Sequence, residues 1–269
     1  MARTGSMART GHLDLDVATS AAVRLSVVIP AYEEASRVGV TVAAVRDALC
    51  AVAAAGGVEI IVVDDGSSDR TAEAAATAGA TVVRFVTNRG KGAAVRAGVL
   101  ASAGRCVAFI DADLAYPPSL LVCLLGEIEA GADVVIGNRH DARSTATSPQ
   151  SVLRRFSGYV FNLLAASVLK GRYRDTQCGL KAFEARCARR IFSRTRLDRF
   201  AFDVEVLHLA ELDGCVVTEV PVTLAHTAGS TVHVVLDALR MVRDLVRIRR
   251  WSHAGCYAAT GRSHLVSAS

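Results

Sequence analysis

The sequence predicts an α/β protein with a mostly parallel sheet and helices on both faces. Short apolar runs rich in β-forming residues alternate with segments of helical spacing, a pattern typical of parallel sheets. Polar clusters follow the runs, at the positions where the strands would end. The chain has 269 residues, 51% of them hydrophobic and 5% aromatic, which suits one large globular domain with appendages.

The first half is expected to hold five strands and four helices. The expected strands cover residues 25–30, 58–63, 81–86, 106–110 and 132–136. The expected helices cover 36–55 with Ser36 as N-cap, 69–78 with Asp69 as its cap, 90–103, and a segment beginning at Pro117 and Pro118. Because the carboxyl ends of parallel strands share one edge of a sheet, the polar clusters there are expected to converge on one site.

The second half is expected to contain fewer strands. A polar loop over 141–150 precedes a helix over 151–169. A polar cluster at 175–181, a helix beginning within 199–205, a strand over 216–220 and a loop over 225–231 come next. A helix over 233–251 closes the pattern.

Charge and cysteine content narrow the class of partner. The net charge of +5 suits anionic substrates or an acidic lipid surface as well as it suits nucleic acid. The motifs described below favour an anionic substrate, and we expect no nucleic-acid partner. Seven scattered cysteines without a C-x-x-C pair favour a reducing compartment. No apolar stretch reaches the length of a membrane span, and no secretion signal is expected.

Two carboxylates, Asp111 and Asp113, directly follow the strand expected at 106–110. At the carboxyl end of a parallel strand they are suited to hold a hard divalent cation such as Mg²⁺, which commonly bridges to substrate phosphates. Taken alone, a D-x-D sequence is more often a helix cap beside a solvated Asp. The clusters around it favour the metal site.

Neighbouring clusters offer further groups for a phosphorylated ligand. Lys91 lies between two glycines at an expected helix start, which favours anion binding, although the spacing is not that of a P-loop and no Gly-x-Gly-x-x-Gly follows the first strand. Asp65 is suited to accept hydrogen bonds from a ribose or base, or belongs to an ordinary turn. Arg139 and one of Arg154 and Arg155 suit a second phosphate.

A catalytic base is less clearly indicated. Asp203 and Glu205 lie two residues apart on an expected helix and therefore cannot share a face, so at most one points into the site, and Asp203 is favoured. The histidines show no metal-binding spacing, and no Ser-His-Asp or Cys-His arrangement is implied. Together the clusters predict an enzyme that handles a metal-bound diphosphate and a second anionic group.

Five segments in order resemble the inverting glycosyltransferases of family 2, and two later segments resemble their dolichyl-phosphate β-glucosyltransferase branch. The first set is Val28–Glu34, Val63–Ser67, Gly90–Gly92, Asp111–Asp113 and Gly137–Arg139; the second is Asp175–Lys181, which contains D-T-Q-C-G, and Ala201–Glu205. The resemblance covers roughly residues 25–250. It implies a GT-A type, Rossmann-like fold over 24–232, with a nucleotide-sugar half at 24–137 and an acceptor half at 138–232.

The resemblance also implies roles for individual residues. The donor, most simply UDP-glucose, would be bound by Pro30, Tyr32, Glu34, Val63, Asp65, Lys91, Asp111, Ala112 and Asp113. Mg²⁺ or Mn²⁺ would be held by Asp111 and Asp113. A polyprenyl phosphate acceptor would be bound by Arg139, Arg154, Arg155, Asp175 and Gln177, and the catalytic residues would be Asp113, Arg139 and Asp203.

Three departures from the family pattern leave alternatives open. Ala115 stands where related mannosyl-transferring enzymes often have a metal-binding Gln, Gly229-Ser230-Thr231 replaces a usual Gly-Ser-Lys, and the N-terminal membrane helix of eukaryotic relatives is not found in the sequence. The alternatives are another nucleotide sugar such as GDP-mannose, a soluble acceptor, or a silent nucleotide-sugar binding protein. A pyrophosphorylase-like enzyme is disfavoured by the missing glycine-rich loop.

The C-terminal segment is expected to contact a membrane surface. Residues 233–252 form a basic amphipathic pattern, with Val235, Leu239, Val242 and Val246 on one face, five arginines and Trp251. Such helices lie on anionic membranes, although a helix packed on the domain fits equally. We therefore expect a cytoplasmic protein, peripheral at the inner face of the membrane, with homo-oligomerisation left open and disordered tails at 1–23 and 253–269.

Overall fold

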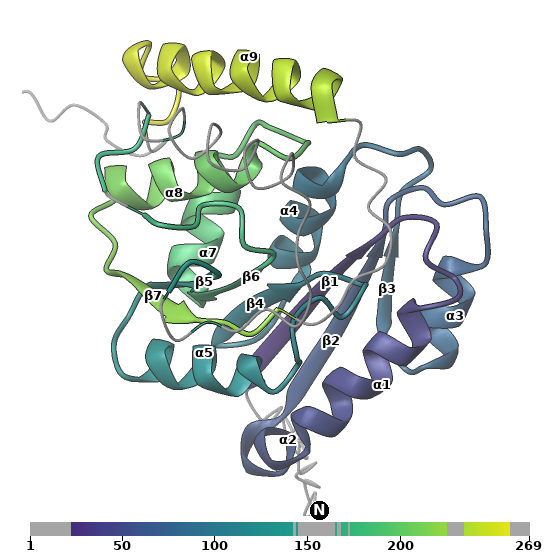
Figure 1. The fold of residues 1–269 in the computed structure, drawn as a ribbon. Coiled ribbons are helices and arrows are strands. Elements are labelled where there is room, and N and C mark those ends of the chain that lie inside the picture. Colours follow the sequence, from purple (N-terminus) through teal and green to yellow (C-terminus); the bar gives the residue numbers. More distant parts are fainter. Residues whose placement is uncertain are drawn as a thin grey trace, which may run out of the picture.

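The computed structural model describes residues 23–141, 144, 165, 168–171, 173–224 and 234–258, with only the backbone described for 234–239. In this part of the chain one seven-stranded sheet has the order β3-β2-β1-β4-β6-β5-β7 (Figure 1). The strands are β1 Leu25–Ala31, β2 Val58–Asp64, β3 Thr81–Arg84, β4 Cys106–Ile110, β5 Val134–Asn138, β6 Leu180–Glu184 and β7 Val217–Pro221. The predicted α/β fold with a mostly parallel sheet is confirmed.

Strand β6 is the antiparallel member of the sheet. It pairs with β4 and β5, with Leu180 opposite Ile110 and Lys181 opposite Phe109. Strands β1, β2, β4, β5 and β7 all run in one direction. The amino end of β6 therefore lies beside their carboxyl ends, so the segment that precedes β6 reaches the same edge of the sheet as the D-x-D motif.

Helices cover both faces of the sheet (Figure 1). Their bounds are α1 Val38–Ala48, α2 Cys50–Gly56, α3 Thr71–Thr77, α4 Lys91–Ala101, α5 Leu120–Glu129, α7 Ala185–Phe192, α8 Phe202–Leu212 and α9 Val234–His253. One core cluster joins α1, α2, α3 and α5 to the sheet, and a second joins α4, α7, α8 and α9. Strand β4 contributes to both core clusters, because its side chains point alternately to the two faces of the sheet. Ala108 faces the first cluster and Phe109 the second.

The first helical segment differs from its prediction. The expected helix over 36–55 breaks at Leu49 into α1 and α2, which are bent by 62°, and the bend brings Val52 into the same core cluster as Val45. Ser36 is not the N-cap, which is Arg37. The loop is instead held from outside the helix, because Asp69 Oδ2 accepts a 3.1 Å hydrogen bond from the Ala35 N–H.

Helix α9 and the turn after it contact α8 through buried polar groups. Glu205 Oε1 accepts a 2.6 Å hydrogen bond from the Tyr257 hydroxyl, and His208 Nε2 lies 2.9 Å from Ser252 Oγ. The disorder predicted from residue 253 is wrong for residues 253–258, since Tyr257 is 3% exposed and residues 254–258 form turns. Among the described helices none alone has the length and apolarity of a membrane span; α1 and α2 meet those criteria only as a bent pair.

Candidate functional site

The D-x-D motif forms a fixed turn at the carboxyl end of β4. Ala112 points into the core with 6% of its surface exposed, and its carbonyl accepts a 2.6 Å hydrogen bond from the Thr41 hydroxyl of α1. Asp111 and Asp113, on either side, are half-buried. The buried anchor between them therefore leaves both carboxylates at the surface of this edge.

Asp113 is held by its own turn. The Ala115 N–H donates a 3.0 Å hydrogen bond to Asp113 Oδ1, and the intervening Leu114 has φ of 56°, a left-handed conformation that is costly outside glycine and recurs at functional sites. Burial and, more weakly, the like charge of Asp113 raise the pKa of Glu34, against the opposing charge of Arg37. Ala115 is buried in the core, so its side chain supplies no metal ligand.

Gly179 of the D-T-Q-C-G motif packs directly against Asp111. A Cβ atom built on Gly179 would lie 2.7 Å from Asp111 Cγ, which is closer than real Cβ contacts. The glycine lets the carboxylate approach this closely, and a larger residue here would displace the Asp111 side chain. The motif that distinguishes this chain within its predicted family thus shapes the space around the first Asp of the D-x-D pair.

Lys91 forms an ion pair with Asp111 at the start of α4. Its Nζ lies 2.5 Å from Asp111 Oδ1, with 22% of the lysine side chain and 28% of the aspartate side chain exposed. Burial acts to lower the pKa of Lys91, but the charges of Asp111 and Asp203 outweigh it and raise that pKa. A positive charge is thus held against the D-x-D motif.

Asp203 is paired with a second lysine inside the domain. Lys181 Nζ lies 2.5 Å from Asp203 Oδ1 and donates a 2.6 Å hydrogen bond to the Cys178 carbonyl. Lys181 is fully buried, and Asp203 is 5% exposed. Burial raises the pKa of Asp203, although Lys181 and Lys91 act in the opposite direction. Glu205 lies on another face of α8 and accepts the backbone N–H of Leu197, so the two acids do not share a face, as predicted.

Replacing Lys181 by Ala is expected to lower the free energy of unfolding by about 3–5 kcal/mol, because it leaves a buried carboxylate without its partner. Urea denaturation followed by circular dichroism measures the change. Lys170→Ala removes an exposed lysine and is the matched control, with an expected change within about 0.5 kcal/mol. A loss below about 1 kcal/mol for Lys181→Ala would show that the ion pair contributes little.

The donor-side residues after β1 and β2 differ in accessibility. Both carboxylate oxygens of Asp65 accept backbone hydrogen bonds, at 2.8 Å from Arg89 and 2.7 Å from Gly90. Burial raises the pKa of Asp65, and those hydrogen bonds oppose the change. Asp65 therefore fixes the loop before α4 and is 4% exposed.

Three further residues that the sequence places at the donor site differ in how exposed they are. Tyr32 is 49% exposed, whereas Val63 is fully buried in the core. Pro30 is partly buried. Val63 therefore offers no surface to a ligand, and its predicted place in the donor site is wrong because the residue lies inside the sheet core.

On the other side of the D-x-D motif, one edge of the Arg139 guanidinium binds both carboxylate oxygens of Asp175. Nε and Nη2 donate hydrogen bonds of 2.6 and 2.8 Å, and the Arg139 backbone N–H donates a third of 3.0 Å. Asp175 is fully buried; burial acts to raise its pKa, but Arg139 outweighs it and holds that pKa below its usual range. The pair uses two of the five N–H donors of the guanidinium and fixes its plane. Gln177, two residues after Asp175, is half-buried.

The structure thus brings Asp111, Asp113, Lys91 and Asp203 together, while Arg154, Arg155 and Thr231 lie outside the described residues. Sequence reasoning missed Gly179 and Lys181 as parts of the site. The D-T-Q-C-G motif was recognised, but its contact with the D-x-D motif depends on the antiparallel strand β6, which was not predicted.

Asp111 and Asp113 fit a divalent cation of the Mg²⁺ or Mn²⁺ type. Both are half-exposed oxygen donors on one turn, and such ions take one or two carboxylates and complete their shell with water and phosphate oxygens. Among the described residues no group of three or more His, Cys, Asp or Glu side chains is arranged to hold a metal. Two carboxylates supply only part of the shell of such an ion, and water and a phosphorylated ligand would supply the rest.

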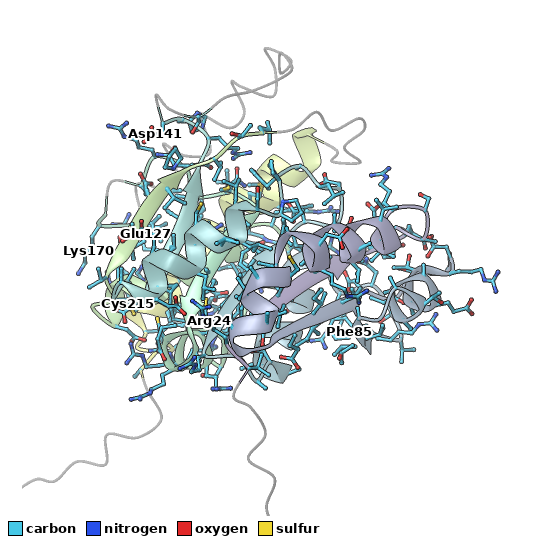
Figure 2. The ribbon with its side chains drawn as sticks, turned by 90° about the horizontal axis from the view of Figure 1, so that it is seen from below. Arg24, Phe85, Glu127, Asp141, Lys170 and Cys215 are labelled. Atoms are coloured by element: carbon cyan, nitrogen blue, oxygen red, sulfur yellow. The ribbon has the colours of Figure 1, made fainter. Side chains whose placement is uncertain are left out.

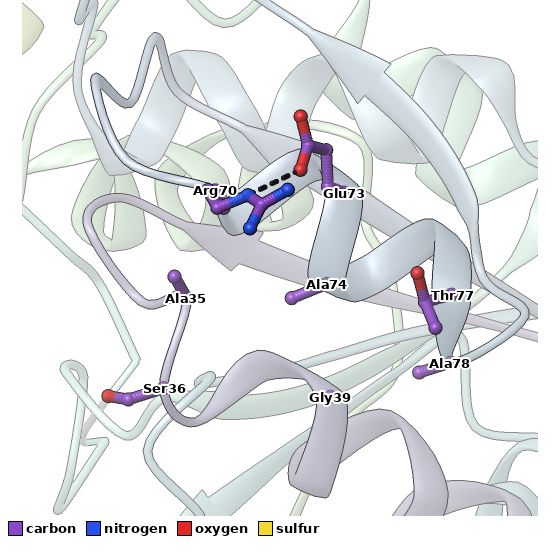
Figure 3. Close-up of a pocket in the computed structure, with 8 residues that line it drawn as sticks. All are labelled: Ala35, Ser36, Gly39, Arg70, Glu73, Ala74, Thr77 and Ala78. Carbon is purple, nitrogen blue, oxygen red and sulfur yellow. Dashed lines mark hydrogen bonds and ion pairs between the residues drawn. The ribbon is translucent and has the colours of Figure 1, made fainter.

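A surface groove also lies between α1 and α3 (Figure 3). Small residues such as Gly39 and Ala74 line it, and the ion pair of Arg70 with Glu73, 2.7 Å long, lies beside it. Neither Asp111 nor Asp113 lines the groove. The carboxyl edge of the sheet therefore remains the candidate site.

Comparison with known proteins shows which family this chain belongs to. The family described as glycosyl transferase family 2 matches residues 26–193, more than half of the chain, and the chain belongs to that family. The resemblance expected from the sequence motifs is confirmed.

Relatives within the family include dolichyl-phosphate beta-glucosyltransferases. The protein from Mus musculus is 34% identical over 246 residues, covering 84% of this chain and 75% of the relative; that from Drosophila melanogaster is 36% identical, covering 85% and 75%. The protein from Dictyostelium discoideum is 34% identical over 203 residues, and the match spans 62% of its length.

The fold is also similar to that of a solved bacterial enzyme. Glucosyl-3-phosphoglycerate synthase from Mycobacterium tuberculosis, crystallised with Mn²⁺, UDP and glucosyl-3-phosphoglycerate, has a TM-score of 0.62, 23% identity, and coverage of 87% of this chain and 80% of that one. This similarity supports the GT-A type architecture.

Proposed function

We propose that the protein transfers glucose from UDP-glucose to a polyprenyl, dolichyl-type phosphate, with inversion at the anomeric carbon. The observation that carries this proposal is the packing of D-T-Q-C-G against the D-x-D motif, where Gly179 makes room for Asp111. The relatives from Mus musculus and Drosophila melanogaster are named dolichyl-phosphate beta-glucosyltransferases. Motif, contact and relatives thus support the same substrate class.

The donor is proposed to bind across the loops after β1, β2 and β4. Tyr32, half-exposed at 49%, offers a ring to the uracil, while Glu34 and the Asp65-anchored loop face the ribose. Asp111 and Asp113 would hold Mg²⁺ or Mn²⁺, which as a Lewis acid stabilises the charge of the departing diphosphate. Lys91, already against Asp111, adds a cation beside the same oxygens.

The acceptor phosphate is proposed to approach Arg139. A phosphate monoester is largely dianionic at neutral pH, so it attacks without a base and requires only positioning. The bidentate contact with Asp175 fixes the guanidinium and leaves three donors that this contact does not use. Asp203, buried and paired with Lys181, is suited to position the site rather than to accept a proton. This favours a phosphate over a hydroxyl acceptor.

Incubation of the protein with labelled nucleotide sugars, polyprenyl phosphate and Mg²⁺ or Mn²⁺ tests the proposal. We expect label from UDP-glucose, and not from GDP-mannose, to move into the organic phase, with a β linkage established by NMR. Transfer from GDP-mannose alone would show that GDP-mannose, and not UDP-glucose, is the donor. A product that stays in the aqueous phase when a small phosphorylated acceptor is supplied would show that the acceptor is not a lipid. UDP-glucose binding without UDP release would indicate a silent binding protein.

Helix α9 is proposed to rest on the inner, cytoplasmic face of an anionic membrane. Leu245 and Ile248 face the domain core, whereas Val242 and Val246, 39% and 55% exposed, form an outward stripe. Exposed arginines flank this stripe, as in helices that lie on anionic lipid. Trp251 packs against the second core cluster, and the guanidinium groups of Arg196 and Arg247 lie over its ring, so it is not counted among the lipid-facing residues.

Changing Val242 and Val246 together to Asp is expected to weaken binding to anionic vesicles at least about tenfold, because the stripe loses its apolar area and gains like charge with the lipid. Vesicle flotation at low and high salt measures the effect. Val122→Asp, at an exposed valine of α5, is the matched control and should float as wild type does. Equal flotation of all three proteins, or none by the wild type, would remove the membrane proposal.

A further inference from the structure

Two cysteines form a close pair at the edge of the sheet opposite the candidate site. Cys187 Sγ on α7 lies 3.2 Å from Cys215 Sγ, just before β7. All seven cysteines of the chain are free thiols. A disulfide has an S–S length of about 2.05 Å, so a shift of about 1.2 Å would bring these two sulfur atoms to bonding distance.

The two thiols lie in different surroundings. Cys187 is 3% exposed, and burial raises the pKa of its thiol. Cys215 is half-buried, and Arg190 Nη2 donates to its sulfur at 3.4 Å. Cys215 is therefore the more accessible of the two sulfur atoms. Two carboxylates lie near the pair. Asp213 forms a 2.7 Å ion pair with Arg190, and the charge of Asp133 acts on Cys187.

We propose that Cys187 and Cys215 are an oxidisable dithiol that closes to an intramolecular disulfide on reaction with a peroxide. The Cys215 thiol loses its proton and its sulfur attacks one oxygen of the peroxide; the O–O bond breaks, the sulfur becomes a sulfenic acid, and the leaving hydroxide takes up that proton as water. The Cys187 thiol then attacks that sulfur; the S–S bond forms, the S–O bond breaks, and water leaves with the proton. In total two thiols and one hydrogen peroxide give one disulfide and two waters.

The position of the pair separates this chemistry from the candidate site. Cys215 precedes the amino end of β7, which is parallel to β5, whereas Arg139 follows the carboxyl end of β5. Figure 2 shows Cys215 well apart from Asp141, which also follows β5. The bond would tie α7 to the edge strand across 28 residues of chain. The proposal therefore does not depend on the proposed transfer reaction.

Oxidation of the full-length, freshly reduced protein with increasing hydrogen peroxide tests the proposal. We expect the intact mass to fall by two hydrogen atoms, peptide mapping to recover a Cys187–Cys215 cross-linked peptide, and Tm to rise by roughly 5–10 °C through loop closure. In Cys187→Ala we expect a dimedone-reactive sulfenic acid at Cys215. Cys50→Ser and Cys123→Ser, at exposed thiols, should leave the cross-link unchanged.

The pairing would be overturned if Cys50 or Cys123 were oxidised at lower peroxide than Cys215. It would also be overturned if the cross-linked peptide joined other cysteines or two chains. The wild-type mapping decides even if Cys187→Ala fails to fold. Glucosyl transfer is measured in parallel, and its absence bears only on the proposed function.

Discussion

Replacing Asp113 by Asn is expected to lower kcat/KM for sugar transfer by about 1,000-fold or more while the fold is retained. The amide oxygen can still accept the Ala115 N–H bond that closes the turn, so the backbone has no reason to move. What is lost is the charge that would bind the divalent cation and, through it, stabilise the departing diphosphate. Radiolabelled transfer assays and Mn²⁺ titration calorimetry in the presence of UDP measure the two losses.

Asp47→Asn is the matched control for this prediction, because Asp47 is an exposed residue of α1. It should transfer sugar and bind Mn²⁺ as the wild type does. Circular dichroism and Tm are expected to be unchanged in both variants. Full activity in Asp113→Asn would remove this residue from the metal site, and normal Mn²⁺ binding with lost activity would assign it a different catalytic role.

The strands that carry the site were predictable because burial on both faces leaves an apolar run with polar residues at its end. The expected strand at 106–110 coincides with β4, and Asp111 follows it as predicted. Strand β6, Leu180–Glu184, was missed because it includes a fully buried Lys181. A buried lysine does not resemble a core residue in sequence, since its partner Asp203 lies 22 positions away.

The site could be predicted as a set of residue types but not as a set of contacts. Carboxylates, guanidinium groups and glycines at strand ends indicate phosphate and metal chemistry. Their pairing depends on packing between distant segments: Arg139 meets Asp175 36 positions away, and the Asp65 carboxylate meets backbone N–H groups before α4. Asp65 and Asp175 thus serve as supports for loops and guanidinium, a role that no local pattern distinguishes from ligand binding.

Replacing Gly179 by Ala is expected to lower kcat/KM by about 100-fold or more, although the glycine carries no functional group. The added Cβ would lie 2.7 Å from Asp111 Cγ, so the carboxylate must move, and a displacement of about 1 Å at a reacting site costs roughly that factor. Mn²⁺ affinity in the presence of UDP should fall with it. Gly126→Ala is the matched control, because a Cβ there has no neighbour within 4 Å and α5 gains helix propensity.

A double-mutant cycle separates this clash from a general loss of stability. In an Asp111→Ala background the carboxylate is gone, so the Gly179→Ala change should cost much less unfolding free energy than it does in the wild type; the coupling expected for residues in direct contact is about 0.5–3 kcal/mol. Additive effects would mean that Gly179 is required for another reason. The contact between the D-T-Q-C-G and D-x-D motifs would then no longer support the proposed substrate class.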